Sequence, residues 1–163
     1  MYKVAVITIS DKGSVGQRED TAGPAICEIL KQNNYKIAYT NIISDDIDGI
    51  KKELIKCADE LNLALVITTG GTGFSPRDNT PEATLGVIDK EVRGIPELMR
   101  AESYKVTDKA YLSRAVAGIR KKTLIINVPG SKKAAIENTN VFIKSLAHGL
   151  DILNGEGSAN CGG

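Results

Sequence analysis

The sequence predicts an α/β protein that folds as a three-layer αβα sandwich around a mostly parallel sheet. Short apolar segments rich in β-branched residues alternate with longer segments whose apolar residues recur at helical spacing. Successive strand, helix and strand segments form βαβ units, whose parallel strands lie between two layers of helices. The apolar runs at 63–69 and 123–128 are typical of buried strands.

The first half of the chain supplies three strands and two helices of this architecture. Pro24 lies in the first turn of the first helix, where proline is well tolerated. In the second helix, Ile47, Ile50 and Leu54 recur at helical spacing and form one apolar face. The expected elements are a strand at 4–9, a helix at 21–32, a strand at 37–43, a helix at 46–62 and a strand at 63–69.

The second half continues the pattern with one irregular stretch. Its expected elements are a helix from Pro81, helical pieces within 94–118, a strand at 123–128 and a helix at 131–153. We therefore expect a single domain at 1–154, followed by a flexible C-terminal tail at 155–163.

Composition indicates an ordinary soluble protein and excludes several partners. Of the 163 residues, 42% are hydrophobic and 25% are charged, which suits a single core. A formal net charge of +1 offers no footprint for nucleic acid or for an anionic membrane. The apolar run at 4–9 is too short for a signal peptide or a spanning helix. We therefore expect a cytoplasmic protein that binds neither nucleic acid nor membrane.

Cysteine and histidine usage argues against zinc, disulfide and hydrolase chemistry. Cys27 and Cys57 lie in helical patterns and Cys161 lies in the tail, with no CxxC pair and no nearby histidine. The only histidine, His148, lies near the end of the last helix. A hydrolase built on a Ser-His or Cys-His pair is therefore not expected.

A glycine-rich loop directly after the third strand is the strongest functional signal. Gly70, Gly71 and Gly73 can adopt positive φ angles and let a ligand approach backbone N–H groups. Arg77 and Asp78 place a cation and a carboxylate beside these glycines. Such a loop suits a phosphate group and a metal ion.

A helix start follows this loop. Thr80 is placed to cap the helix, with Pro81 at the first position and Glu82 in the first turn. The loop lacks the third glycine of the Rossmann fingerprint, follows the third strand instead of the first, and has no P-loop lysine. It therefore predicts a phosphate or nucleotide site of another kind.

The carboxyl ends of the strands are expected to bring separate residues to one edge. Ligands of open α/β sheets bind beyond these ends, so Asp45 and Asp78 form a candidate carboxylate pair for hydrated Mg²⁺. Helix capping by Asp45 or Asp46 is an alternative, as is a turn role for Asp78. The segments expected at this edge are Ser10, Asp11, 44–46, 70–78 and 129–131.

Five sequence blocks then occur in a characteristic order. They are Asp11-Lys12-Gly13-Ser14, Thr68-Thr69-Gly70-Gly71-Thr72-Gly73, Arg77-Asp78-x-Thr80-Pro81-Glu82-Ala83, Leu112-Ser113-Arg114 and Asn127-Val128-Pro129-Gly130-Ser131. In order and spacing, along nearly the whole chain, they resemble the MogA/MoaB family of molybdenum-cofactor biosynthesis. The Thr-Pro-Glu-Ala and Leu-Ser-Arg blocks are closer to Mog, whereas the block from Pro129 to Lys133 is closer to MoaB.

This resemblance implies a reaction as well as a fold. In the family, molybdopterin and MgATP give adenylylated molybdopterin and pyrophosphate. The attacking phosphate of molybdopterin is largely ionised at neutral pH without a base, because its second pKa is about 6. Positioning, a metal and donors for phosphate charge are then what the protein must supply. A pterin carrier without transfer activity and a structural interaction module are the alternatives.

The resemblance also implies roles for individual residues. Asp45 and Asp78 match two functionally required aspartates, and we assign both to Mg²⁺ binding and catalysis. Ser113 matches a substrate-binding serine, although its position alone indicates a structural serine inside a helix. The other substrate-binding candidates are Ser10, Gly70, Gly71, Thr72, Gly73, Arg77, Pro129, Gly130 and Ser131, the last also a candidate N-cap. Further candidate phosphate partners, ranked below Arg77, are Lys12, Arg114 and Lys132.

Expected partners follow from the same resemblance. ATP and molybdopterin are the expected substrates, a homotrimer is the expected assembly, and a MoeA-type molybdenum-insertion protein is a candidate partner. Apolar residues of the irregular stretch offer contact area for the trimer, with core packing as the alternative. These residues are Ile95, Leu98, Met99, Tyr104 and Tyr111.

Overall fold

The structure, a computed structural model, describes residues 1–155 of the chain. Within this range, six strands form one sheet in the order β2-β1-β3-β6-β5-β4. The first four strands in that order are parallel, while β5 runs antiparallel to β6 and β4 antiparallel to β5. The strands are β1 (Lys3–Ile9), β2 (Lys36–Ile43), β3 (Leu65–Thr69), β4 (Lys90–Glu91), β5 (Ala117–Arg120) and β6 (Thr123–Val128).

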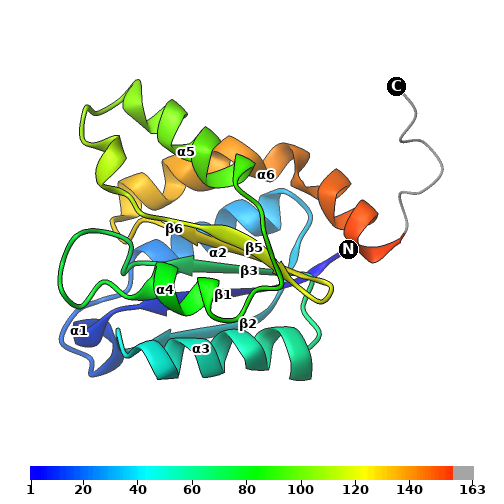
Figure 1. Ribbon diagram of the computed structural model, residues 1–163, viewed down its shortest axis with the longest axis horizontal. Coiled ribbons are helices and arrows are strands. Elements are labelled where there is room, and N and C mark those ends of the chain that lie inside the picture. The colour runs from blue at the N-terminus through cyan, green and yellow to red at the C-terminus, as the bar shows by residue number, and fades with distance from the viewer. Residues whose placement is uncertain (156–163) are drawn as a thin grey trace.

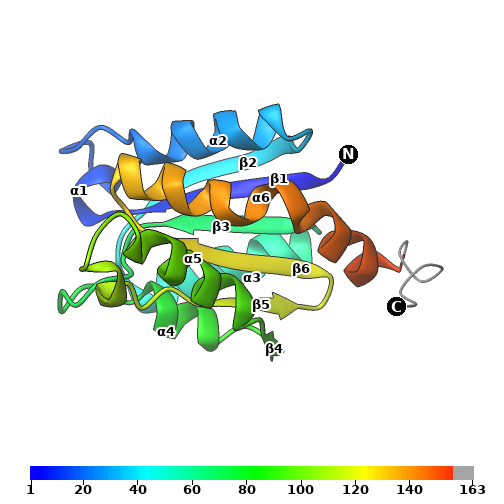
Figure 2. The same ribbon diagram turned by 90° about the horizontal axis from the view of Figure 1, so that it is seen from above.

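Helices cover both faces of the sheet and produce the three layers that the sequence predicts (Figure 1). One face carries α2 (Ala22–Gln32), α5 (Gly94–Tyr104) and α6 (Lys132–Asn154), which Figure 2 shows from above. The opposite face carries α3 (Ile47–Ile55) and α4 (Thr80–Leu85), which pack against each other. The predicted fold class is therefore confirmed.

Side chains that point alternately to the two faces of the central strands divide the hydrophobic core into two clusters. Val4 and Val6 of β1 pack with residues of α2 and α6, whereas Ala5 and Ile7 pack with residues of α3 and α4. Successive side chains of a strand point to opposite faces, so a strand covered on both sides is apolar at nearly every position. This two-sided burial explains why the central strands read as continuous apolar runs in the sequence.

Two local predictions are wrong. The helix expected at 46–62 is α-helical only to Ile55 and ends in a π-helical turn, Lys56–Glu60. The stretch at 94–118 holds α5 and a 3₁₀ turn, Ala110–Leu112, but it ends in strand β5 instead of helix. The pattern also does not indicate β4. Both strands are very short and lie at the antiparallel edge, so pairing with neighbours, and not local pattern, determines them.

The C-terminal helix α6 ends at Asn154, and its C-cap, Gly155, adopts the left-handed conformation with a φ angle of 82°. The rest of the expected tail, with Cys161, lies outside the described residues, and a single domain at 1–154 stays a prediction. Nowhere within residues 1–155 is a helix both long and apolar enough to cross a bilayer.

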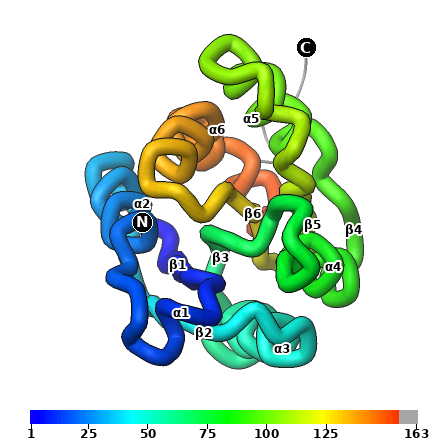
Figure 3. The backbone as a smooth tube through the Cα atoms, turned by 90° about the vertical axis from the view of Figure 1, so that its left-hand side faces the viewer, coloured from blue at the N-terminus to red at the C-terminus, as the bar shows by residue number. Residues whose placement is uncertain are grey.

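The parallel strands end level with one another at the edge that faces the viewer in Figure 3. Their register shows this, because Ile9 pairs with Ile43, Thr8 with Thr69, and Thr69 with Val128. The short helix α1 (Asp11–Ser14) begins directly beyond β1 at the same edge. The loops that leave these strands therefore meet in one place.

Candidate active site

A cavity of about 700 Å³ lies at the carboxyl ends of the parallel strands. All four loops predicted to meet there contribute to its wall. The lining residues that matter for the argument are Ser10, Asp11, Asp45, Gly71, Asp78 and Ser131. The topology thus brings the two candidate aspartates, 33 positions apart in sequence, to the same cavity.

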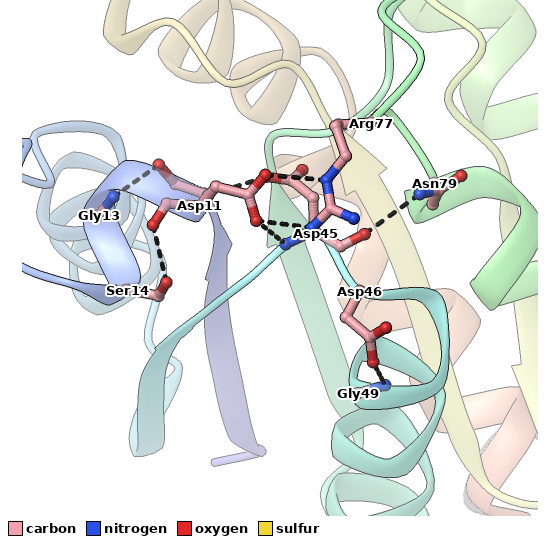
Figure 4. Close-up of polar contacts among 9 residues, drawn as sticks. Asp11, Gly13, Ser14, Asp45, Asp46, Gly49, Arg77 and Asn79 are labelled. Carbon is pink, nitrogen blue, oxygen red and sulfur yellow. Dashed lines mark hydrogen bonds and ion pairs between the residues drawn. The ribbon is translucent and has the colours of Figure 1, made fainter.

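Asp45 does not cap helix α3, which the sequence allowed as an alternative role. The cap of α3 is the neighbouring Asp46, whose carboxylate accepts a hydrogen bond from the N–H of Gly49 at 2.7 Å. Asp45 is instead only 8% exposed, and its Oδ2 accepts a hydrogen bond from the N–H of Asp11 at 2.8 Å. Figure 4 shows this contact beside the cap. Asp45 is therefore a buried carboxylate held by the backbone of the loop after β1.

The electrostatic surroundings of Asp45 disfavour its charged form. Burial raises the pKa of its carboxyl group, and the negative charges of Asp11 and Asp78 raise it further. The hydrogen bond from the Asp11 N–H and the charge of Arg77 act in the opposite direction. A cation placed between Asp45 and Asp78 would relieve this repulsion.

Asp78 has the local contacts of a turn residue. Its N–H donates to the carbonyl of Ser75 at 2.9 Å, and its Oδ2 accepts from the N–H of Ser75 at 3.0 Å. Its Oδ1 accepts no hydrogen bond from residues 1–155, and the same holds for Oδ1 of Asp45. Each aspartate therefore has one oxygen held by a backbone N–H and one oxygen available to a ligand.

This donor set fits a magnesium ion that receives its remaining ligands from elsewhere. In the described part of the chain, no group of three or more histidine, cysteine, aspartate or glutamate side chains is arranged to hold a metal. Mg²⁺ is commonly bound through one or two carboxylates together with water and substrate phosphates. Asp45 and Asp78 match that pattern, and they do not match a closed, all-protein metal site.

Gly70 and Gly71 must be glycines, because neighbouring atoms leave no room for a side chain at either position. Gly70 and Gly71 have φ angles of 103° and 68°, which favour glycine. A Cβ atom on Gly70 would lie 2.3 Å from the carbonyl oxygen of Ile9. One on Gly71 would lie 2.3 Å from Oγ1 of Thr80 and 3.1 Å from Oδ1 of Asp45.

Gly73 differs from these two glycines because its φ is not positive. A Cβ atom there would lie 2.9 Å from Oδ2 of Asp78, so this position also has little room for a side chain. The N–H groups of Gly71, Thr72 and Gly73 donate to no acceptor within residues 1–155. The loop therefore offers the unpaired backbone donors that the sequence predicts for an anion site.

Thr80 does not cap α4, contrary to the sequence prediction. The capping position is occupied by Asn79, whose amide donates to the carbonyl of Asp45 at 3.2 Å. Thr80 is fully buried, and its hydroxyl donates to the carbonyl of Gly70 at 2.9 Å. The glycine turn has a buried carbonyl that needs a donor, and this need determines the orientation of Thr80.

Two arginines tie the glycine loop to its surroundings. Arg77 donates from Nε and Nη2 to the carboxylate of Asp11, at 3.0 and 2.9 Å. Arg114 donates to the carbonyls of Gly73 and Asp78, each at 2.8 Å, and pairs with Glu82. Arg114 therefore clamps the loop. Lys12, Arg18 and Lys132 also line the cavity, and their side chains form no ion pair or hydrogen bond within residues 1–155.

A second cavity of about 400 Å³ adjoins the first. It contains Ser113, which follows the 3₁₀ turn in extended conformation, so the expectation of a helix-interior serine is wrong. The reason is that the chain leaves the turn to enter β5. Both cavities are lined by Gly71, Asp78 and Gly130, so the aspartate lies where they meet.

Comparison with known proteins identifies the family. Residues 5–148 match the family described as the probable molybdopterin binding domain. The chain belongs to this family. The resemblance to MogA and MoaB proteins is therefore confirmed.

Three relatives of this chain are similar to it over most of their length. A molybdopterin adenylyltransferase from Helicobacter pylori (strain ATCC 700392 / 26695) is 44% identical over 154 residues, covering 93% of this chain and 88% of the relative. One from Escherichia coli (strain K12) is 40% identical, covering 94% and 78%. The molybdopterin biosynthesis enzyme MoaB from Thermus thermophilus superposes with a TM-score of 0.90 at 44% identity, covering 95% of this chain and 98% of that one.

The predicted site residues of this chain divide between the two cavities. Ser10, Gly70, Arg77 and Ser131 line the first cavity, and Thr72, Gly73, Ser113 and Pro129 line the second. Two of the serines also have the local role of an N-cap. Oγ of Ser10 accepts from Gly13 N–H at 2.9 Å, and Oγ of Ser131 accepts from Ala134 N–H at 3.3 Å.

Sequence reasoning missed two acidic residues of the first cavity. Asp11 was expected at the sheet edge and in a family block but without a role of its own, yet it contacts both Asp45 and Arg77. Asp20 accepts hydrogen bonds from the hydroxyl of Thr8 and the N–H of Gly23, at 2.7 and 2.9 Å, and so joins β1 to the start of α2. For both residues, the available signal is the position of an aspartate just beyond a strand or just before a helix.

Proposed function

We propose that this chain is a molybdopterin adenylyltransferase. It transfers the adenylyl group of ATP to the terminal phosphate of molybdopterin and releases pyrophosphate. A phosphate oxygen of molybdopterin forms a bond to the α-phosphorus, and the bond to the pyrophosphate oxygen breaks, with pyrophosphate taking the electron pair. The observation that carries the proposal is the meeting of two cavities at Asp78 and the glycine loop, which suits two substrates that react with each other.

The proposed reaction needs no side-chain base. A phosphate monoester is largely ionised near neutral pH, since its second pKa is about 6, and it is therefore already a nucleophile. This requirement agrees with cavity walls that contain no histidine among the described residues. The contribution of the protein is then alignment of the two phosphates and stabilisation of the charge that develops between them.

We place the triphosphate of ATP in the first cavity. The side chains of Lys12, Arg18 and Lys132 have no protein partner there among the described residues, so their charges are available to an anion. The 23-residue helix α6 also begins at this cavity, with Lys132 in its first turn. Its N-terminal N–H groups favour negative charge.

We place molybdopterin in the second cavity, with its terminal phosphate toward the glycine loop. Ser113 supports this placement, because it lines that cavity and matches a substrate-binding serine of the family. Thr72 and Gly73 also line this cavity, and their N–H groups, which have no acceptor within residues 1–155, suit phosphate oxygens. Arg77 stays a candidate phosphate partner, although Asp11 now pairs with it.

We also propose Mg²⁺ as the metal of this site. Asp45 and Asp78 would hold it through their free carboxylate oxygens. Bound there, the ion would neutralise the triphosphate charge and stabilise the leaving pyrophosphate. The raised pKa of Asp45 supports the proposal, because a carboxyl group in unfavourable surroundings gains most from a cation.

A direct assay separates this proposal from its alternatives. Purified protein is incubated with molybdopterin, ATP and magnesium, and both pyrophosphate and adenylylated pterin are quantified. Magnesium-dependent formation of both products supports the transferase. Tight pterin binding with no product assigns the chain to the carrier class, and no binding of either substrate assigns it to a structural module.

We propose the homotrimer and the MoeA-type partner on family resemblance, together with a cytoplasmic location. Of the apolar residues considered for subunit contacts, Met99 is part of the core and Ile95 packs against it. Leu98, Tyr104 and Tyr111 are exposed by 45%, 67% and 69%, and these three are available for a subunit interface. Size-exclusion chromatography with light scattering measures the assembly directly.

A further inference from the structure

Asp11 and Asp45 hold each other through two opposite hydrogen bonds. The N–H of Asp11 donates to Oδ2 of Asp45 at 2.8 Å, and the N–H of Asp45 donates to Oδ1 of Asp11 at 3.0 Å. Asp11 begins α1 after β1, and Asp45 follows β2, so this exchange joins the ends of two neighbouring strands. Figure 4 shows the two aspartates lying face to face.

Arg77 completes the arrangement from a third loop. Its Nε and Nη2 donate to Oδ2 and Oδ1 of Asp11 at 3.0 and 2.9 Å, in the two-pronged geometry that arginine forms with carboxylates. Asp11 therefore links three of the loops that build the first cavity. Both of its oxygens are used in doing so, which leaves Asp11 poorly placed to bind a metal itself.

We propose that Asp11 is a positioning residue for adenylyl transfer. Its carboxylate holds the backbone of Asp45 and its N–H holds the carboxylate of Asp45, and together they keep that carboxylate in the orientation that the transfer site requires. This inference rests on the proposed function. Asp11 acts through Asp45.

The geometry of Asp45 explains why it needs such a support. Asp45 is only 8% exposed, and the N–H of Asp11 is the only hydrogen-bond donor to its carboxylate within residues 1–155, so the position of Asp11 determines the direction of that carboxylate. With Oδ2 held by Asp11, Oδ1 lies on the side of the glycine loop, 3.1 Å from where a Cβ of Gly71 would be. Ligand carboxylates held in this way by neighbouring hydrogen bonds keep their orientation.

A purely local role does not account for the Asp11 carboxylate. The cap of α1 is Ser10, whose Oγ accepts the N–H of Gly13, so Asp11 is not needed for it. The ion pair with Arg77 is exposed, at 58% and 43% for the two side chains, and exposed pairs add little to stability. The carboxylate of Asp11 is therefore needed mainly as the acceptor for the N–H of Asp45.

Two variants of Asp11 test the proposal, with Asp46→Asn as a matched control. Asp11→Ala removes the acceptor for Asp45 N–H and the partner of Arg77, whereas Asp11→Asn keeps an acceptor of similar shape. The control changes the neighbouring acid to asparagine, which is also a good N-cap. For each protein, kcat, KM for both substrates and the thermal unfolding midpoint are measured. Mn²⁺ binding in the presence of an ATP analogue with a methylene between the α- and β-phosphates is measured by electron paramagnetic resonance.

We expect Asp11→Ala to lower kcat and to weaken Mn²⁺ binding, each by about tenfold or more, as for residues that orient metal ligands. KM for molybdopterin stays close to the wild-type value, Asp11→Asn recovers part of both losses, and Asp46→Asn resembles wild type. Unchanged Mn²⁺ affinity in Asp11→Ala, or a loss accounted for by a lower fraction of folded protein, overturns the proposal. If wild type forms no product, the proposed function fails, and the Mn²⁺ comparison still decides whether Asp11 positions Asp45.

Discussion

The hydroxyl of Thr80 donates a hydrogen bond to the backbone carbonyl of Gly70, 2.9 Å away, from within the first turn of α4. Both groups are buried, and the contact holds the positive-φ turn of the glycine loop against the helix that follows it. The loop at the centre of the site is therefore shaped by a side chain ten residues further along the chain.

Thr80→Val tests this contact while keeping the shape of the side chain. It leaves the buried carbonyl of Gly70 without a donor, and we expect a loss of unfolding free energy of about 1–3 kcal/mol. Thr123→Val is the matched control, because its hydroxyl donates to the carbonyl of Leu63 at the opposite end of the sheet. Urea denaturation shows similar destabilisation for both variants. Only Thr80→Val loses transfer activity, and equal activity in the two variants would contradict a role for this contact.

Gly71→Ala tests the close approach of the loop to Asp45. A methyl group there lies within 2.3 Å of the Thr80 hydroxyl, and the φ of 68° adds backbone strain. We expect a loss of stability of about 1–3 kcal/mol from the strained backbone and a lower kcat. Gly94→Ala is the control, because a Cβ there meets no atom within 4 Å. A Gly71→Ala enzyme with wild-type kcat would argue against the placement of the loop.

Asp78→Asn separates the metal role from pterin binding. The substitution removes the charge of one carboxylate and keeps an acceptor for the N–H of Ser75. We expect transfer to fall by about a hundredfold or more, since groups that stabilise developing charge contribute effects of this size. Molybdopterin affinity, measured by fluorescence titration, stays near the wild-type value. Full transfer activity in the variant would exclude Asp78 as a metal ligand.

The pair of Asp59 and Arg120 gives a pH prediction outside the site. Hydrogen bonding from Arg120 lowers the pKa of Asp59 from 3.8 to about 2. A depressed pKa means that the pair stabilises the folded state above about pH 4, and that this contribution is lost as the pH falls through about 2. The wild-type protein should therefore have a higher unfolding free energy than Asp59→Asn at about pH 4, and this difference should become smaller as the pH falls from about 4 to about 2. In an Arg120→Met background the change with pH should become smaller, because only Lys121, whose Nζ lies 3.1 Å from Oδ2 of Asp59, still lowers the pKa. A wild-type advantage independent of pH would contradict the pairing.

The sequence is sufficient to predict those parts of the site that depend only on the topology of the sheet. Asp45 and Asp78 lie at one cavity because β2 and β3 are parallel and end at the same edge of the sheet. The sequence does not decide which of the two neighbours, Asp45 or Asp46, caps helix α3. The capping role depends on which of the two carboxylates meets the N–H groups of α3, which the structure assigns to Asp46.

Other residues depend on contacts that no local pattern indicates. Thr80 looks like an N-cap, yet its hydroxyl bonds to Gly70, because the folded loop brings that carbonyl within reach. Ser113 looks like a helix residue, yet the chain there is extended because β5 pairs with β6. The partners of Asp11 come from loops 34 and 66 positions away. These features follow from tertiary packing, which outweighs local propensity.

The most direct test of the account follows the adenylyl group itself. Purified protein receives molybdopterin, magnesium and ATP that carries a label on its α-phosphate, and the products are separated by chromatography. We predict that the label moves to the pterin, with one unlabelled pyrophosphate released for each labelled pterin formed, and that omission of magnesium or the Asp78→Asn substitution prevents the transfer. Label that stays in ATP while molybdopterin is bound, or that is released as free AMP, would contradict the assignment as an adenylyltransferase.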